Sequence, residues 1–421
     1  MLLAMTAVSC KLPAADRPPV AADPAIAAQA INALGLDLLA RGTAANGNAL
    51  LSPYSIQSAL AMTYAGAAGD TQAEMARVLH FPANEADLHR SFAELRTRLE
   101  AMSKASEERA KRAKEWGGPN EPVTLTVANR LFGEQNYEFR APFLALTKDL
   151  YQAPFQPMDF KTAWEAARLQ INSWVEEQTR QRIRDLVPVD GLNKNTRLVL
   201  VNAVYLKAPW AEVFPQHATK PEPFHVNGGV AVPVPMMARK DDFGYQRGEG
   251  FAVVTIPYSG GDLQFVVVVP DAVDGLAAVE GKLTAELLAS FAKPNATQVN
   301  LHLPKFKLEP PMMRLSEALQ SLGMKTAFDK PKDNANFDRM APRKPDDYLF
   351  ISDVFHKTFL ELDEKGTEAA AATAVVMMRP TSIAPDPPKP VEVNVDRPFL
   401  FAIQQRSSGA CLFLGRVVDP R

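Results

Sequence analysis

Hydrophobic positions in the first quarter of the chain recur at helical spacing. Ser52 and Pro53 begin one such stretch, and a proline in the first turn of a helix costs no backbone hydrogen bond. The small and apolar residues that follow recur in steps of three or four: Ile56, Ala59, Leu60, Thr63, Tyr64 and Ala67. Because this spacing gathers them on one face, the pattern predicts an amphipathic helix that ends at Gly66 to Gly69.

Two further patterns predict helix boundaries. Thr71 and Glu74 have the spacing of a capping box, so we expect the next helix to begin at Thr71. Residues 103–116 mix basic and acidic side chains, which is typical of a solvated helix face rather than of a polyanion site. The Gly-Gly-Pro-Asn sequence at 117–120 predicts the end of that helix.

Strand patterns dominate the rest of the chain. They are alternating or continuous apolar runs at 123–132, 197–206, 263–270, 299–303, 391–395, 398–403 and 410–417. Helices gather mainly in the first half and strands in the second, without regular alternation. This order predicts an α+β fold in which helices pack on large mixed or antiparallel sheets. We find no internal repeat and no linker between residues 25 and 421, so we expect one domain there.

Composition narrows the possible functions. The 46 basic and 48 acidic residues nearly balance, which gives no reason to expect a nucleic-acid partner. The two cysteines, Cys10 and Cys411, lie at opposite ends of the chain, and the six histidines lack the spacing of a zinc site. The sequence also lacks a phosphate loop, a dinucleotide fingerprint and a G-x-S-x-G elbow. We therefore expect neither a metal, a cofactor nor an enzyme.

The first 24 residues carry a separate signal. A short apolar run ends in small residues and Cys10, and a Pro/Ala-rich polar stretch follows at 11–24. This pattern resembles the end of a bacterial lipoprotein signal, in which Cys10 would be lipidated. The alternative is a disordered, mildly apolar terminus. We expect a signal remnant or tether at 1–24, a secreted protein in the extracellular space or the cell envelope, and membrane contact only through a lipid on Cys10.

An ordered series of motifs runs through the chain. Asn-Ala-Leu-Leu-Ser-Pro-Tyr-Ser-Ile at 48–56 is similar to the serpin helix signature. Further blocks follow in family order at 64–67, 128–132, 171–175, 200–207, 303–306, 322–324, 363–373 and 397–399. The resemblance covers about residues 30–421.

The resemblance implies an irreversible inhibitor, in which a serine protease attacks an exposed reactive loop as a substrate. Before the acyl-enzyme hydrolyses, the loop inserts into the main sheet as a new central strand and distorts the protease. The loop would span about residues 364–390 of a 25–421 serpin domain. The protein would act as a monomer.

The start of this loop suits strand insertion. One alternate set of side chains is small or apolar and uncharged: Thr367, Ala369, Ala371, Thr373, Val375 and Met377. Glu368 falls in the other set, no proline interrupts residues 364–379, and Gly366 supplies backbone freedom at the base. The alanine run is also compatible with a helix in the uncleaved loop. The candidate hinge residues are Glu364, Gly366, Thr367, Ala369, Ala370, Ala371, Ala372 and Thr373.

The resemblance also implies two polar networks that control opening of the sheet. The matching shutter positions are Ser52, Ser55, Asn202 and His356. The matching breach positions are Trp210, Lys305 and Glu364. We expect the four shutter side chains to share a network and Lys305 to pair with Glu364.

The cleaved bond is less determined. Counting seventeen residues from Glu364 puts Pro380 on the acyl side, although proline suits few serine proteases. The candidates are Met378, Arg379, Pro380, Thr381 and Ser382. A bond after Met378 favours a subtilisin-, chymotrypsin- or elastase-like enzyme, and Pro380 after Arg379 disfavours a trypsin-like one.

A non-inhibitory serpin acting as a binding or chaperone-like module is the alternative function, which the small hinge residues argue against. An enzyme built on the same fold is a third reading, but the sequence shows no nucleophile and base to support it.

Overall fold

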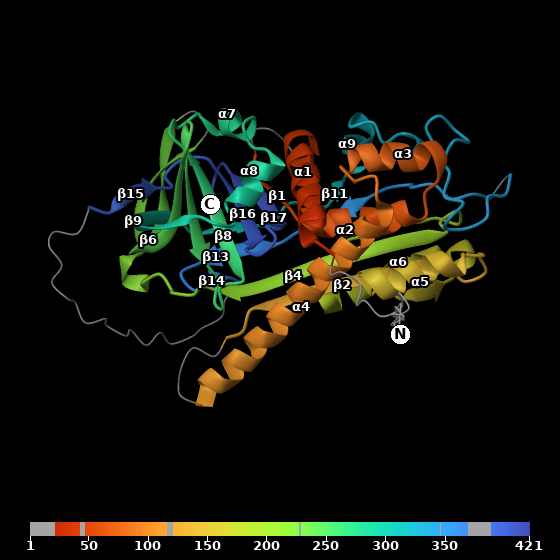
Figure 1. Ribbon diagram of the computed structural model, residues 1–421, viewed down its shortest axis with the longest axis horizontal. Coiled ribbons are helices and arrows are strands. Elements are labelled where there is room, and N and C mark those ends of the chain that lie inside the picture. The colour runs from red at the N-terminus through yellow and green to blue at the C-terminus, as the bar shows by residue number, and fades with distance from the viewer. Residues whose placement is uncertain (1–21, 43–46, 116–120, 227–228, 346, 369–388) are drawn as a thin grey trace, which may run out of the picture.

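Two large β-sheets with helices packed around them make up the computed structural model (Figure 1). The structure describes residues 22–42, 47–115, 121–226, 229–345, 347–368 and 389–421. The α-helices in this part are α1 (Pro24–Gly42), α2 (Pro53–Ala65), α3 (Gly69–Val78), α4 (Glu85–Glu115), α5 (Ala141–Tyr151), α6 (Phe160–Gln178), α7 (Leu276–Glu280), α8 (Ala285–Ser290) and α9 (Ser316–Ser321). Short 3-10 helices lie at η1 (Gln216–Ala218) and η2 (Thr326–Phe328).

The six-stranded sheet positions the candidate site. Its strand order is β10 (Phe306–Leu308), β13 (Leu360–Asp363), β14 (Gly366–Thr367), β4 (Leu198–Pro209), β2 (Thr124–Glu134) and β3 (Phe155–Met158). A separate two-stranded pair joins β11 (Met313–Arg314) and β12 (Phe355–His356). α2 lies on one side of β4 and α6 on the other (Figure 1).

The second sheet has nine strands. Their order is β1 (Ala49–Leu51), β17 (Cys411–Val417), β16 (Phe399–Gln405), β8 (Leu263–Pro270), β7 (Phe251–Pro257), β6 (Val230–Gly248), β9 (Asn295–Pro304) and β15 (Val391–Asn394), with β5 (Lys220–Val226) paired to β6. The predicted α+β fold with large mixed sheets is confirmed, since β15 pairs with β9 in parallel while most other pairs are antiparallel.

Hydrophobic burial divides into two clusters. The larger one joins α1 and α2 to the nine-stranded sheet. The smaller one lies between α6 and the six-stranded sheet, where Phe160, Ile171 and Val175 of the helix pack with Phe132 and Val201. α6 therefore covers one face of the sheet that contains β14.

The predicted start and end of α2 are confirmed. Ser52 is the N-cap and its hydroxyl accepts a hydrogen bond from the Ser55 amide, while Pro53 is the first helical residue and Gly66 the C-cap. The helix presents its buried face to β4 and β17. The predicted charged helix is present as α4, which is described as far as Glu115, and the predicted break at 117–120 lies outside the described residues.

The predicted capping box at Thr71 is wrong. α3 already begins at Gly69, so Thr71 lies inside its first turn. The Thr71 hydroxyl accepts a hydrogen bond from the Asn336 amide at 3.0 Å, and the Glu74 carboxylate accepts from the Thr326 amide at 2.8 Å. Both side chains satisfy groups more than 250 residues away in the chain, instead of each other's backbone.

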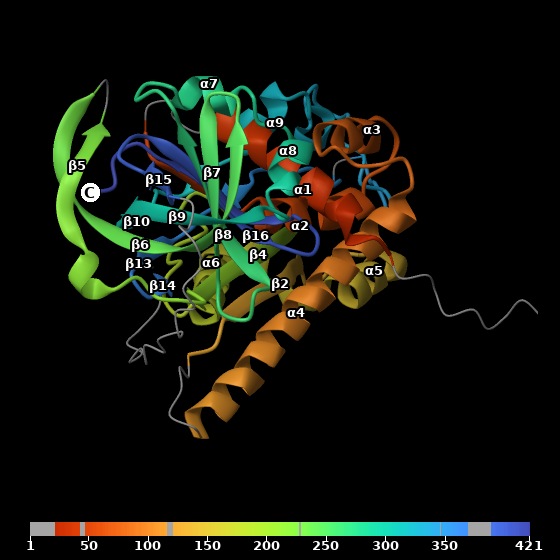
Figure 2. The same ribbon diagram turned by 60° about the vertical axis from the view of Figure 1, so that its left-hand side comes forward.

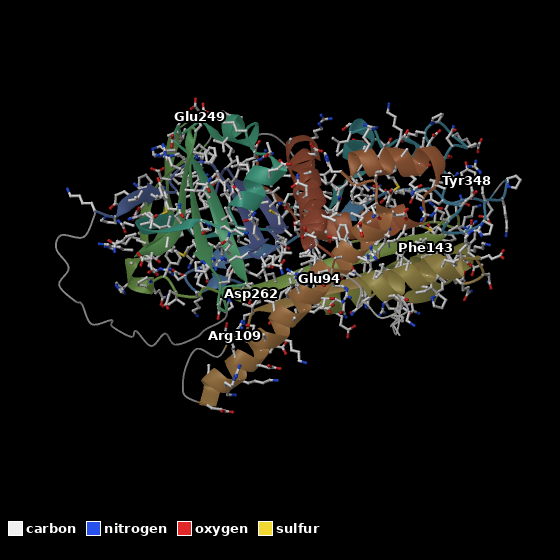
Figure 3. The ribbon with its side chains drawn as sticks, viewed as in Figure 1. Glu94, Arg109, Phe143, Glu249, Asp262 and Tyr348 are labelled. Atoms are coloured by element: carbon white, nitrogen blue, oxygen red, sulfur yellow. The ribbon has the colours of Figure 1, made fainter. Side chains whose placement is uncertain are left out.

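The long α4 extends away from the rest of the molecule (Figure 2). Near its far end, Arg109 lies beside the turn between β7 and β8, with its guanidinium 3.9 Å from the Asp262 carboxylate (Figure 3). In the described residues no helix has the length and apolar character needed to span a bilayer.

Candidate functional site

The candidate site begins where the chain leaves β13 and immediately pairs again as β14. Thr367 lies opposite Leu362 of β13 on one side and opposite Ala208 of β4 on the other. Two hinge residues, Gly366 and Thr367, therefore already occupy a central position in the six-stranded sheet. Outside the described residues lie the hinge candidates Ala369, Ala370, Ala371, Ala372 and Thr373 and the bond candidates Met378, Arg379, Pro380, Thr381 and Ser382.

Glycine is required at the turn into β14. Gly366 has φ +147°, in the region that side chains rarely adopt. A Cβ at this position would lie 2.2 Å from the carbonyl oxygen of Ala208. The two amides at the turn, Lys365 N–H and Gly366 N–H, both donate to the Asp363 carboxylate, at 2.8 and 3.2 Å.

Thr367 points into the buried layer of the sheet, as its place in the inward set requires. Its exposure is 2%, and its hydroxyl is hydrogen-bonded to that of Tyr258. The Tyr258 ring stacks on Trp210 with the centroids 4.6 Å apart. Burial raises the pKa of Tyr258 far above its usual value, so the hydroxyl stays neutral at physiological pH.

Trp210, Lys305 and Glu364 are brought together around the start of the loop. The indole N–H of Trp210 donates to the Asp363 carbonyl at 2.9 Å. The expected ion pair is present, with Lys305 Nζ 2.8 Å from Glu364 Oε2, and the Thr219 hydroxyl donates to Glu364 Oε1 at 2.8 Å. Burial alone would raise the pKa of Glu364, but these hydrogen bonds outweigh it and lower the pKa.

The candidate shutter residues come from three elements: Ser52 and Ser55 from the start of α2, Asn202 from β4 and His356 from β12. The Ser52 amide donates to His356 Nε2 at 3.1 Å, and the Ser52 hydroxyl donates to the Leu412 carbonyl at 2.7 Å. Burial lowers the pKa of His356 to about 4, so the imidazole is neutral at pH 7 and Nε2 can accept. Asn202 lies on β4 opposite Asn129, and its side chain is outside the description.

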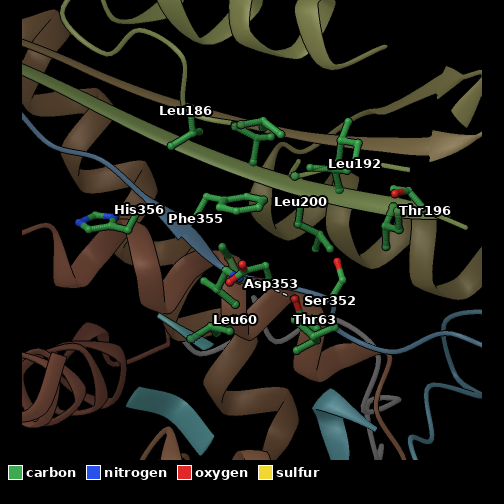
Figure 4. Close-up of a pocket in the computed structure, with 18 of the residues that line it drawn as sticks. Leu60, Thr63, Leu186, Leu192, Thr196, Leu200, Ser352, Asp353, Phe355 and His356 are labelled. Atoms are coloured by element: carbon green, nitrogen blue, oxygen red, sulfur yellow. Dashed lines mark hydrogen bonds between the residues drawn. The ribbon is translucent and has the colours of Figure 1, made fainter. Parts of the chain in front are cut away.

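An apolar cavity of about 320 Å³ lies between β4 and residues 348–358 (Figure 4). Its walls come from α2, β4, residues 183–201 and residues 348–358. Leu186, Leu200 and Phe355 supply apolar surface, and His356 and Thr63 supply polar groups (Figure 4). Among the described residues, no strand pairs with the edge of β4 from Leu198 to Lys207 on the side away from β2.

Three contacts of this site were missed by the sequence reasoning. Tyr258 and Asp363 hold β14, and Arg182 forms an ion pair with Glu368. Tyr258 and Arg182 are 109 and 186 residues from their partners, so no local pattern indicates either contact. Within the described part of the chain, no group of three His, Cys, Asp or Glu side chains is arranged to hold a metal ion.

The fold, with β14 paired between β13 and β4, defines a class of protein, and similarity to known proteins identifies that class. The family model "Serpin (serine protease inhibitor)" matches residues 29–420, so the chain belongs to the serpin family, whose members are usually protease inhibitors rather than enzymes.

Individual relatives agree with this assignment. The leukocyte elastase inhibitor of Bos taurus is 38% identical over 89% of this chain and 93% of its own. A tumour suppressing serpin has a similar structure, with TM-score 0.78 and 25% identity over 94% of this chain and all of its own. The thermophilic serpin tengpin in its native state has TM-score 0.75 and 27% identity over 93% of each chain.

Proposed function

We propose that this serpin irreversibly inhibits a serine protease by inserting its cleaved reactive loop into the six-stranded sheet. The observation that carries the proposal is the position of β14. Its two residues are paired with both β13 and β4. Beyond them, among the described residues, no strand pairs with this edge of β4, and the cavity lies along it.

The register of β14 indicates where the rest of the loop would go. Continuing both pairings one residue at a time from Thr367 brings Thr373 between Asn202 and His356. Three of the other inward residues have expected neighbours that line the cavity: Val204 and Thr358 for Ala371, Leu200 and Val354 for Val375, and Leu198 and Ser352 for Met377. Ala369 would lie between Leu206 and Leu360, outside the cavity. From Ala371 onward, the inward residues of the loop thus meet the existing cavity in register.

Insertion would release a large free energy. A strand of about ten residues between two strands forms about 20 backbone hydrogen bonds, each worth about 0.5–1.5 kcal/mol net. The total is on the order of 10 kcal/mol, comparable with the whole stability of an ordinary domain. The pairing of β15 with β9 fixes the other end of the loop, so full insertion needs either cleavage of the loop or, at high temperature, release of β15.

The chemistry belongs to the protease. Its serine hydroxyl attacks the scissile carbonyl, the peptide C–N bond breaks, and the C-terminal fragment leaves with the new amine. The loop remains attached through an ester, which insertion carries away before water can cleave it. Similarity to the leukocyte elastase inhibitor supports an elastase-like target within the predicted subtilisin-, chymotrypsin- or elastase-like set.

Incubation with elastase, chymotrypsin, subtilisin and trypsin tests the proposal. We expect an SDS-stable covalent complex with one of the first three, and the mass of the released C-terminal peptide identifies the bond. We also expect the cleaved protein to melt at a much higher temperature than the uncleaved one. Cleavage by all four without a complex, and without a rise in melting temperature, would favour the non-inhibitory binding module instead.

We propose further that the protein acts outside the cytoplasm, tethered through a lipid on Cys10, which lies outside the described residues. The support is the apolar run and small residues before Cys10. Labelling with a radioactive fatty acid should mark the unmodified chain and not a Cys10→Ala variant. Equal labelling of both, or of neither, would contradict the tether.

A further inference from the structure

β14 ends at Thr367 because the next residue leaves the strand conformation. Glu368 has φ +51°, a left-handed conformation that is uncommon for a residue with a side chain. Its amide still donates to the Glu361 carbonyl at 2.9 Å, so Glu368 keeps the register with β13. Its pairing with β4 stops, since the last matched pair on that side is Thr367 with Ala208.

Arg182 holds Glu368 in this conformation. The Arg182 guanidinium forms an ion pair with the Glu368 carboxylate, whose side chain is 10% exposed. The same guanidinium lies 4.8 Å from the centre of the Phe359 ring. Arg182 belongs to the segment between α6 and β4, so it joins the hinge to a part of the chain outside the sheet.

The other charged groups near Glu368 either pair with another residue or repel its carboxylate. Lys207 of β4 is paired with Glu121 at 3.2 Å. Glu361 of β13 adds a like charge, and burial raises the pKa of Glu368 in spite of Arg182. The desolvated carboxylate therefore depends on Arg182 as its ion-pair partner.

The position of Arg182 conflicts with growth of the strand. Continuing the pairing with β13 brings Ala370 opposite Phe359, on the same outward side of the sheet as Glu368. Arg182 contacts both Glu368 and Phe359, which lie on either side of the position that Ala370 would take. For the next residues to enter, Glu368 must become extended and Arg182 must move.

We propose that Arg182 and Glu368 form a catch that arrests strand insertion after Thr367 in the uncleaved protein. The inference rests on the proposed function, because it concerns the same insertion step. Arg182 is a positioning residue: it touches neither the protease nor the scissile bond, and acts through Glu368. Releasing the catch lets the strand advance.

Two variants test the catch by removing one charge each: Glu368→Gln, which is isosteric, and Arg182→Gln. Uncleaved protein is held just below its melting temperature, and samples are scored over time for conversion to a heat-resistant form on native gels. We expect conversion about tenfold faster in both variants, the size expected for losing a charge-assisted hydrogen bond to a partly buried group. The double exchange Arg182→Glu with Glu368→Arg should return the rate to within about threefold of the original.

Arg184→Gln is the matched control. Arg184 lies on the same segment and carries the same charge, but its guanidinium bonds to the Gln181 carbonyl of its own segment. Its conversion rate should be unchanged. Unchanged or slower conversion in the catch variants, an equal effect of the control, or no rescue by the exchange would overturn the catch. If Arg182→Gln fails to fold, two other single variants give the same comparison. Glu368→Gln removes the charge and should convert fast, whereas Arg182→Lys keeps the charge and should convert slowly.

This experiment separates the catch from the inhibitor proposal. Heat resistance after cleavage by a metalloprotease reports insertion without any trapped serine protease. If the original protein inserts but traps no serine protease, the inhibitor proposal fails and the conversion rates still judge the catch. If the cleaved protein gains no heat resistance, strand insertion itself is absent and both proposals are overturned.

Discussion

Replacing Thr367 with arginine gives the sharpest test of strand insertion. Thr367 is 2% exposed, and the polar group beside it is the neutral hydroxyl of Tyr258. An arginine there would place a guanidinium in the buried layer with no counter-ion. An uncompensated buried charge of this kind costs about 3–5 kcal/mol. Since about 1.4 kcal/mol is a factor of ten, insertion would slow by about two to four orders of magnitude.

The uncleaved variant can avoid most of this cost. Gly366 and the new arginine can move out of the sheet, which loses the pairing of these two residues and leaves the rest of the sheet intact. After cleavage there is no such escape, because every residue beyond Thr367 must follow it into the sheet. Hydrolysis of the acyl-enzyme then outruns insertion, so the Thr367→Arg variant becomes a substrate.

The assay is a titration of a fixed amount of protease, with complex and cleaved protein separated on SDS gels. We expect the unmodified protein and a Thr367→Ser control, which keeps the hydroxyl, to give mostly complex. Thr367→Arg should give mostly cleaved protein and active protease. Equal complex formation by Thr367→Arg and Thr367→Ser would refute the assignment of Thr367 to the inserted strand.

Three further predictions concern the surrounding networks. Gly366→Ala should lower the free energy of unfolding in urea by about 2 kcal/mol, because its Cβ would meet the Ala208 carbonyl oxygen; an unchanged midpoint would contradict this. Lys305→Gln should lower the free energy of unfolding in urea by about 1 kcal/mol, a small value because Lys305 is partly exposed. If the loss comes from the ion pair with Glu364, the difference between the two proteins should disappear in 1 M salt. Acidification should destabilise the native state: the folded pKa of His356 is about 4 against 6.5 unfolded, so stability is full above pH 6.5 and falls by about 3 kcal/mol as the pH drops to 4. A His356→Gln variant should lack that part of the pH dependence in thermal melts.

The sequence predicts those features that depend on local patterns. The start of α2 at Ser52 and Pro53 was predicted because these residues and the apolar spacing lie within one segment. β4 was predicted from its apolar run. The family motifs, rather than any period, indicated the ion pair between Lys305 and Glu364.

Features that depend on distant partners were not predicted. The capping box failed because Thr71 and Glu74 bond to residues 336 and 326 instead of to their own helix. The left-handed turn at Glu368 has no local signal, since neither glycine nor asparagine stands there. β14 is only two residues long, so its existence depends on β13 and β4 lying on either side.

The position of β14 also bears on which residues govern the speed of insertion. A strand that must enter a closed sheet first breaks pairs on both sides before it gains any. Here Gly366 and Thr367 are already paired on both sides, so each further residue adds bonds without a new nucleation step. The barrier therefore lies at the first residue that has not entered, which is Glu368. Substitutions at Glu368 and Arg182 should change the rate of insertion. Substitutions at Val375, which is expected beside Leu200 in the cavity, should change mainly the stability of the inserted product.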